Sequence, residues 1–300
     1  MTTTNADGLD MPLVIVNGNA SGLMRHGGVA PIRKLLLAMG RPCEIAITES
    51  ESAFERAWPA DPTRRVILVG GDGTVHLAAN LPGPTPEIGL VPAGRANNVA
   101  RSLGIPLDLE AATRLAVSGE PNPIDLIEAR TATTTYRVVE GLSVGFLASA
   151  RTRFDHGNSA ATLPALGAGV RALGKFHPLG VHVTRHGHDE GDLRIAQLFV
   201  ANLPLYEFGL QVAPQVDPRD GQLDFVAVDA AGRRSILPMI VRLLRGSHLG
   251  RRDVHTWRAP TARIVAHGRS PIVGDSTNLG SGTVELSPLR GALRIVSPTL

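Results

Sequence analysis

Three glycines and an aspartate stand between a predicted strand and a predicted helix, in the stretch GGDGT at residues 70–74. The apolar run VILV precedes them and VHLAANL follows. A glycine-rich turn at the carboxyl end of a parallel strand lets backbone N–H groups approach phosphate oxygens. The alternative is a turn without a ligand, since glycine also ends strands and helices for purely conformational reasons.

Two further loops have a similar composition. NGNASG at residues 17–22 ends the first predicted strand, and PAGRANN at residues 92–98 ends the fourth. Ligands of open α/β sheets bind outside the carboxyl ends of the strands, so we expect all three loops at one edge of the sheet. Their convergence favours a nucleotide phosphate site over three unrelated turns.

Asp72 requires a cation in this hypothesis, because a carboxylate beside phosphates is repelled unless a positive ion lies between them. Mg²⁺ bound together with ATP would supply that ion. The loop is not a Walker A motif, since no Gly-Lys-Ser/Thr follows the glycines, and it lacks the GxGxxG pattern of dinucleotide-binding proteins. We therefore expect ATP and Mg²⁺ as cofactors.

The composition excludes several classes of protein. The chain has 300 residues, 43% of them hydrophobic, which is enough for a large core and suits two domains. A formal net charge of +3 is too small to indicate nucleic-acid binding. The single cysteine, Cys43, excludes an intrachain disulfide and a cysteine-based zinc cluster, and it fits the reducing cytoplasm.

No part of the sequence resembles a signal peptide or a membrane span. The first twelve residues lack a basic region followed by an apolar one, and no apolar run approaches the roughly 20 residues that cross a bilayer. Any membrane contact is therefore expected to be peripheral.

Apolar, β-branched runs alternate with helical patterns through about the first 120 residues. This alternation predicts a doubly wound α/β domain with a parallel sheet. From Ile124 onward, short alternating strands separated by Gly-, Asp- and Pro-rich turns predict a mainly antiparallel β domain. We place the domains at residues 1–123 and 124–300, with the return of the last strand to the first domain left open. The predicted strands of the first domain cover residues 12–18, 43–50, 64–71 and 87–94.

The motifs occur in the order VNGNASG, VGGDGT and VPAGRANNVARSLGIP. In this order and at these separations they resemble the diacylglycerol kinase catalytic-domain family, which includes bacterial lipid kinases and the sphingosine and ceramide kinases. The resemblance continues to the end of the chain, through IDL at 124–126, LSVGF at 142–146, VANLPLYEFGLQVAP at 200–214, DGQLD at 220–224 and the final GALRIVSP.

The resemblance implies an α/β nucleotide domain followed by a β-sandwich lipid-substrate domain. It also implies an ATP-dependent lipid kinase that phosphorylates the hydroxyl of a diacylglycerol-like lipid, in the cleft between the domains, at the inner face of the membrane. Residues carried over by motif would line the phosphate site: Asn17, Ser21, Gly22, Gly70, Gly71, Asp72, Gly73, Thr74, Gly94, Arg95 and Asn97. Arg25 is a further candidate phosphate ligand, with a solvated arginine at a helix start as the alternative.

Two acidic sites are also implied by the resemblance. Asp275 in VGDST matches the aspartate of the family's DGE motif, which acts as the general base, a role that contributes about 10²–10⁴-fold to a rate. Asp220 and Asp224 of DGQLD, with Asp217, match a stretch that places a structural Mg²⁺ in some members. An Asp-Gly turn that opens a strand is the alternative for this stretch.

The sequence departs from the family pattern at the expected active site. Arg95 replaces the usual threonine, and either strengthens phosphate binding or obstructs it. His76 and Leu77 replace an Asn-Glu pair, and Thr277 stands where DGE has its glutamate. Glu140 likewise stands where asparagine is common. These departures keep a catalytically silent nucleotide- or lipid-binding relative as an alternative. An NAD kinase or sugar-phosphate kinase would explain GGDGT but not PAGRANNVARSLGIP.

The stretch at residues 233–252 contains six arginines and no acidic residue, alongside apolar residues at helical spacing. A basic amphipathic helix of this kind lies on anionic membranes, but the same pattern describes a helix packed on a sheet with a charged rim. The sequence leaves that choice, and the possibility of a homodimer, open.

Overall fold

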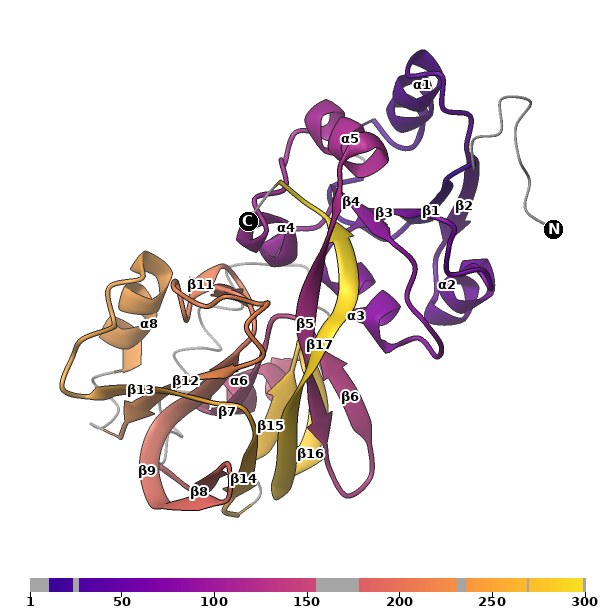
Figure 1. The fold of residues 1–300 in the computed structure, drawn as a ribbon. Coiled ribbons are helices and arrows are strands. Elements are labelled where there is room, and N and C mark those ends of the chain that lie inside the picture. The colour runs from indigo at the N-terminus through magenta and orange to yellow at the C-terminus, as the bar shows by residue number, and fades with distance from the viewer. Residues whose placement is uncertain (1–10, 24–26, 155–177, 231–235, 269, 299–300) are drawn as a thin grey trace. The chain divides into compact units, whose positions relative to one another are not determined.

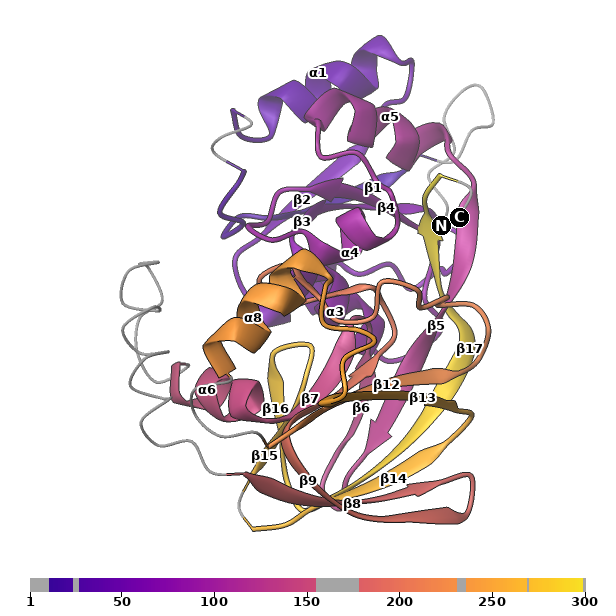
Figure 2. The ribbon, with the colours of Figure 1, turned by 90° about the vertical axis from the view of Figure 1, so that its left-hand side faces the viewer.

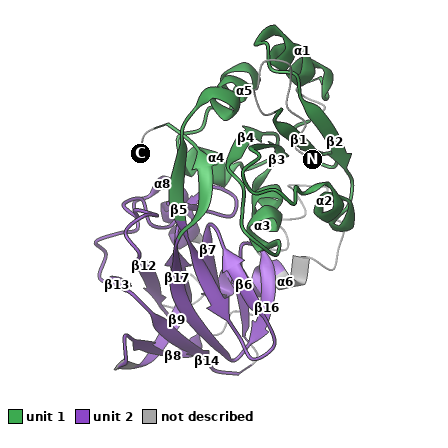
Figure 3. Ribbon diagram, turned by 45° about the vertical axis from the view of Figure 1, so that its right-hand side comes forward, with its two compact units in different colours: residues 1–124, 291–300 green, residues 125–290 purple. Residues whose placement is uncertain are grey.

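The computed structural model describes residues 11–23, 27–154, 178–230, 236–268 and 270–298. The chain divides into two compact units (Figure 3): unit 1 comprises residues 1–124 and 291–300, and unit 2 comprises residues 125–290. Unit 1 is α/β and unit 2 is mainly antiparallel β, which confirms the expected fold class.

Unit 1 is built on a parallel sheet with the strand order β2-β1-β3-β4 (Figure 1). Its central strands are buried along their whole length, as is typical of a parallel sheet with both faces covered. The last strand of the chain adds to the β4 edge, where Ile295 pairs with Ile88 in parallel. The strands are β1 (Leu13–Asn17), β2 (Glu44–Thr48), β3 (Val66–Gly70), β4 (Ile88–Pro92) and β17 (Thr283–Val296).

The helices in the described part of unit 1 are α1 (Ala30–Ala38), α2 (Glu51–Ala57), α3 (Asp72–Asn80), α4 (Asn98–Ser102) and α5 (Leu109–Ser118). Two of them begin at side-chain caps, since Ser50 accepts from the N–H of Ala53 and Asp108 from that of Ala111. Residues of α1 and α5 share one core cluster with β1, β3 and β4, so both helices pack on the same sheet.

Unit 2 contains a large antiparallel sheet with the order β16-β15-β7-β9-β8-β14-β17 (Figures 1 and 2). Strand β12 pairs with both β9 and β13, while β5 pairs with β6. The strands are β5 (Pro121–Arg130), β6 (Thr135–Val138), β7 (Gly141–Gly145), β8 (Leu179–Arg185), β9 (His188–Ala201), β12 (Leu223–Asp229), β13 (Val254–Ala259), β14 (Ala262–Ala266), β15 (Pro271–Gly274) and β16 (Thr277–Ser281), with a separate hairpin of β10 (Leu205–Tyr206) and β11 (Leu210–Gln211).

Alternate residues of β9 enter two different cores. Leu198 and Val200 belong to one cluster, whereas Phe199 and Ala201 belong to another that includes residues of helix α8 (Ile236–Arg245). This alternation follows from the two-residue period of a strand and explains why β9 is apolar on both faces. Helix α6 (Phe146–Phe154) follows β7. Residues 159–176, where small and apolar residues recur at helical spacing in the sequence, lie outside the described residues.

Among the described helices, none combines the length and hydropathy that a membrane span requires.

Candidate functional site

The three glycine-rich loops of unit 1 meet at the carboxyl ends of β1, β3 and β4. Gly22 donates its backbone N–H to the carbonyl of Ala93 at 2.8 Å, and Ala93 donates to the carbonyl of Gly70 at 2.7 Å. The loops are also joined by a side-chain bond, from Nδ2 of Asn17 to Oγ1 of Thr74 at 3.0 Å. The convergence expected from parallel topology is therefore present in the structure.

The glycines of these loops are required by close approach of backbone to backbone. A Cβ added to Gly71 would lie 2.7 Å from Cα of Gly94, and one added to Gly94 would lie 2.5 Å from Cα of Gly71. At Gly22 the added atom would lie 2.7 Å from the carbonyl oxygen of Ala93. By contrast, a Cβ on Gly73 would meet nothing within 4 Å. Only residues without side chains allow the second and third loops to touch.

Asn97 holds the third loop in shape. Its backbone adopts a left-handed conformation with φ of 51°, which asparagine tolerates better than most residues. The side-chain Oδ1 accepts from the N–H of Gly94 at 2.8 Å, and Nδ2 donates to the carbonyl of the same glycine at 3.2 Å. Asn97 thus closes the turn that brings Gly94 against Gly71.

Asp72 has a structural partner inside unit 1. Its Oδ1 accepts a hydrogen bond at 2.9 Å from the N–H of Val99, in the first turn of α4. This bond satisfies one of the N–H groups that a helix start leaves without an intrahelical acceptor. Asp72 lies in the first turn of α3, and Gly71, the N-cap of that helix, offers no side chain to its first N–H groups.

The other predicted residues of this region differ in exposure. Ser21 and Arg95 are exposed, whereas Thr74 is buried; Arg25 lies outside the described residues. His76 is also buried, at 7% exposure on α3. Within the described part of the chain, no group of three His, Cys, Asp or Glu side chains could hold a metal ion.

In unit 2 the carboxylate of Asp275 is buried among backbone N–H groups. It is 3% exposed and accepts from Val139, from Glu140 at 2.8 Å and from Gly141 at 3.3 Å. The N–H of Asp275 in turn donates to the carbonyl of Gly141 at 3.1 Å. Asp275 therefore connects the β15–β16 turn to the start of β7. Its own backbone adopts a left-handed conformation with φ of 47°.

Tyr206, for which the sequence predicts no role, lies near Asp275. Tyr206 is buried and donates its hydroxyl to Oγ of Ser143 at 3.1 Å. Burial raises the pKa of Tyr206 well above its usual value, and the negative charges of Glu207, Asp275 and Glu140 add to the rise. The backbones of Glu207 and Phe208 have positive φ values of 29° and 22°, which a linear sequence does not display.

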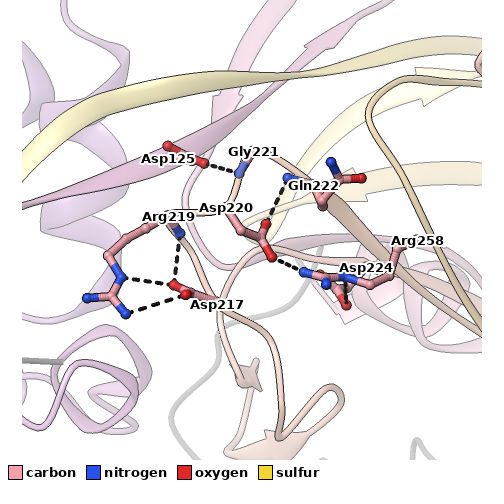
Figure 4. A network of polar contacts seen from close by, with 8 residues as sticks. All are labelled: Asp125, Asp217, Arg219, Asp220, Gly221, Gln222, Asp224 and Arg258. Carbon is pink, nitrogen blue, oxygen red and sulfur yellow. Dashed lines mark hydrogen bonds and ion pairs between the residues drawn. The ribbon is translucent and has the colours of Figure 1, made fainter.

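The predicted metal ligands Asp217, Asp220 and Asp224 lie on the loop before β12 and at its start (Figure 4). Each one faces a guanidinium group: Asp217 pairs with Arg219 at 2.9 Å, and Arg258 pairs with both Asp220 and Asp224. The Arg219 hydrogen bond lowers the pKa of Asp217. Burial raises the pKa of Asp224 to about 6. As they stand, these side chains are directed at arginines and do not form a donor set for a metal ion.

An apolar pocket lies elsewhere in unit 2. Helix α8 contributes Met239, Ile240 and Leu243, and Phe146 and Leu147 of α6 lie across from them. The outer side of α8 leaves Val241 and Leu244 exposed.

Comparison with known proteins matches the chain to two family models. Residues 11–129 match the family described as "Diacylglycerol kinase catalytic domain", and residues 141–297 match the one described as "YegS C-terminal NAD kinase beta sandwich-like domain". A diacylglycerol kinase of Mycobacterium tuberculosis is 29% identical over 251 residues, which is 80% of this chain and 78% of that protein. A "Probable lipid kinase YegS-like" of Cronobacter sakazakii is 38% identical over 122 residues, 38% of this chain and 40% of the other.

Solved structures show the same fold at low identity. A diacylglycerol kinase structure from Bacillus anthracis has a TM-score of 0.69 and 18% identity, covering 95% of this chain and 96% of that one. An NAD kinase from Archaeoglobus fulgidus in complex with ATP has a TM-score of 0.54 and 14% identity, covering 96% and 94%. With matched domains spanning both units, the chain belongs to the diacylglycerol kinase catalytic-domain family of lipid kinases.

Proposed function

We propose that this chain is an ATP- and Mg²⁺-dependent kinase that transfers the γ-phosphate of ATP to the hydroxyl of a diacylglycerol-like lipid. The observation that carries the proposal is the contact between Gly71 and Gly94, which presents two loop backbones at the carboxyl ends of β3 and β4. Backbone donors at such an edge suit a polyphosphate chain. Phosphoryl transfer depends mainly on this kind of positioning and on neutralising phosphate charge.

The loop residues have separate roles in this proposal. Asn17 and Thr74 fix the first loop to the second through their hydrogen bond of 3.0 Å. Arg95 is exposed on the third loop and contributes a guanidinium to the phosphates, replacing a neutral donor with a charged one. Mg²⁺ that arrives with ATP would neutralise phosphate charge beside Asp72.

For the transfer step we assign the general-base role to Asp275. A bond forms between the lipid oxygen and the γ-phosphorus, the bond from that phosphorus to the bridging oxygen of ADP breaks, and the hydroxyl proton passes to the carboxylate. The N–H groups of Val139, Glu140 and Gly141 hold the carboxylate in one orientation.

The same geometry favours one alternative. A carboxylate that is 3% exposed and engaged by three backbone N–H groups also suits a purely structural anchor. In that case the chain binds nucleotide or lipid without transferring phosphate.

We also propose peripheral contact with the inner face of the cytoplasmic membrane, through α8. Val241 is 37% and Leu244 47% exposed, and Arg242 and Arg245 occupy the last turn of a helix that has no acidic residue. Exposed apolar side chains beside arginines suit an anionic lipid surface.

One experiment separates these possibilities. The purified chain is incubated with labelled ATP and Mg²⁺ in the presence of diacylglycerol, sphingosine, ceramide, NAD or a sugar phosphate. The proposal expects label in the diacylglycerol product and none without Mg²⁺. Transfer to NAD or sugar phosphate alone would refute it, and ATP binding without any transfer would establish the silent alternative.

A further inference from the structure

Arg258 lies directly across from Asp224 in the pairing of β12 with β13. Its Nε is 3.2 Å from Oδ1 of Asp224, and a terminal nitrogen of the same guanidinium donates to Oδ2 of Asp220 (Figure 4). One cation therefore joins the start of β12 to the loop that precedes it. These carboxyl side chains are only 26% exposed for Asp220 and 18% for Asp224, so the pairs are partly withdrawn from water.

The rest of the loop is held by its own hydrogen bonds. Oδ1 of Asp220 accepts from the N–H of Gln222 at 2.9 Å, and Oδ2 of Asp125 accepts from the N–H of Gly221 at 2.7 Å. The N–H of Asp125 donates to the carbonyl of Pro218 at 2.6 Å. The loop thus has a defined shape in which each of these carboxylates has a protein donor.

A second guanidinium lies against the same loop. Gly221 has a φ of +69°, and a Cβ added there would lie 2.1 Å from Cζ of Arg290. Arg219 pairs with Asp217 on the other side. Arg219 and Arg258 are therefore paired with Asp217, Asp220 and Asp224, and Arg290 adds a third positive charge near the loop.

This arrangement does not provide the converging oxygen ligands that a divalent cation needs. Mg²⁺ and Ca²⁺ require oxygen ligands that converge on one point at about 2.0–2.6 Å from the ion. A guanidinium instead binds two carboxylates through separate N–H groups, and its charge repels a metal ion nearby. We infer that Arg258 takes the place of a structural divalent cation in this loop, so that unit 2 holds residues 217–224 without metal.

The inference is independent of the proposed kinase activity, because it concerns only the acidic loop and β13. The inference depends most on the surroundings of the Asp224 carboxylate. Oδ2 of Asp224 is buried and lacks a hydrogen-bond partner among the described residues. If Arg258 were removed, this oxygen and those of Asp220 would be left facing a site without a cation, which a metal ion could then fill.

The test compares the thermal stability of the full chain, without nucleotide, in EDTA and in MgCl₂ or CaCl₂ at about 10 mM, a level that would fill weak oxygen-ligand sites. For the wild type we expect the two melting temperatures to agree within about 1 °C, because no site is filled. Arg258→Ser should melt roughly 3–6 °C lower in EDTA and recover at least half of that loss when either metal is added. Calorimetry with the metal alone should detect binding in this variant and none in the wild type.

The matched control is Arg251→Ser, which removes a guanidinium paired with a single carboxylate, that of Asp253, at 2.8 Å. Its melting temperature should be the same in EDTA and in metal. Arg258→Lys keeps the positive charge and should also remain insensitive to metal, which tests the inference even if Arg258→Ser does not fold. Three results would each overturn the inference. They are metal binding to the wild type that Asp224→Asn abolishes, a melting temperature of Arg258→Lys that changes with metal, and a melting temperature of Arg258→Ser that does not.

Discussion

The carboxylate of Asp72 accepts a hydrogen bond at 2.9 Å from the backbone N–H of Val99, so the aspartate of the second loop caps the helix that follows the third. This bond gives Asp72 a structural role in addition to the metal contact that we propose. Two substitutions distinguish the roles, because asparagine keeps a hydrogen-bond acceptor and loses the charge, whereas alanine loses both.

Asp72→Ala should lower the free energy of unfolding by about 1 kcal/mol, the usual effect of removing a helix cap, and should weaken Mg·ATP binding. Asp72→Asn should stay near wild-type stability and still bind Mg·ATP more weakly. Urea unfolding and calorimetry measure the two effects. An asparagine variant with unchanged nucleotide affinity would leave Asp72 with the capping role alone.

The contact between the second and third loops predicts a large difference between two glycines. Gly94→Ala should destabilise unit 1 by about 1–3 kcal/mol, because the new methyl group would lie 2.5 Å from Cα of Gly71 and the backbones must separate. Gly73→Ala is the matched control in the neighbouring second loop, since its methyl group meets nothing within 4 Å. Urea unfolding should show little or no loss for the control, and equal losses for both variants would contradict the role of close approach.

Asp275→Asn tests the general base. ATP binding should persist, while the rate of lipid phosphorylation should fall by about 10²–10⁴-fold. The amide nitrogen of asparagine cannot accept from the backbone N–H groups of Val139 to Gly141, so we also expect a loss of about 1–3 kcal/mol in stability. Rates must therefore be measured where unfolding curves show the variant to be folded. Turnover above about a third of the wild-type rate would exclude this role for Asp275.

His248 predicts how stability changes in mild acid. The ring is fully buried, and its Nε2–H donates to the carbonyl of Val212 at 2.8 Å. Burial lowers the pKa of His248 in the folded chain, because it disfavours the charged imidazolium. The unfolded chain therefore takes up this proton first, and stability is lost as pH falls from about 6.5 toward the folded pKa.

His248→Gln should flatten that part of the pH profile, measured as the free energy of unfolding between about pH 7 and pH 5. The control is His255→Gln, which alters an exposed histidine paired with Asp229. His255→Gln should leave the decline in the free energy of unfolding unchanged. If the decline persists in His248→Gln, its cause lies in another group.

The proposed membrane contact predicts a change confined to the outer side of α8. Replacing Val241 and Leu244 together by serine should lower binding to vesicles that contain phosphatidylglycerol by about tenfold, because two apolar side chains no longer enter the lipid. Leu37→Ser alters an equally apolar side chain on α1, 62% exposed, and should bind like the wild type. Sedimentation with vesicles measures both, and equal loss in all variants would point to non-specific adhesion.

The sequence predicts the first unit well because its signals are local. Each buried strand is a short β-branched run, and the glycines stand where those runs end, so parallel topology alone brings Gly22, Gly71 and Gly94 to one edge. Helix α1 likewise follows a local pattern, with Ile32 and Leu36 one turn apart and both buried.

The relationships that depend on register between distant strands could not be predicted in this way. Arg258 reaches Asp220 and Asp224 only because β13 pairs with β12 in one register, which a single sequence does not specify. Likewise, the N–H groups that surround Asp275 come from residues more than 130 positions earlier in the chain. The motif identifies the aspartate in the sequence, but it does not identify the backbone N–H groups that bind its carboxylate.

The pairing of Ile295 with Ile88 has a consequence for synthesis of the chain. Strand β4 emerges from the ribosome long before β17. One edge of the sheet in unit 1 therefore lacks its partner strand while the whole of unit 2 is translated. Until then β4 offers unpaired backbone groups, which are prone to join other strands. A fragment that stops before residue 291 would keep that edge unpaired, which makes the final strand part of the folding of unit 1 and not an appendage of the β domain.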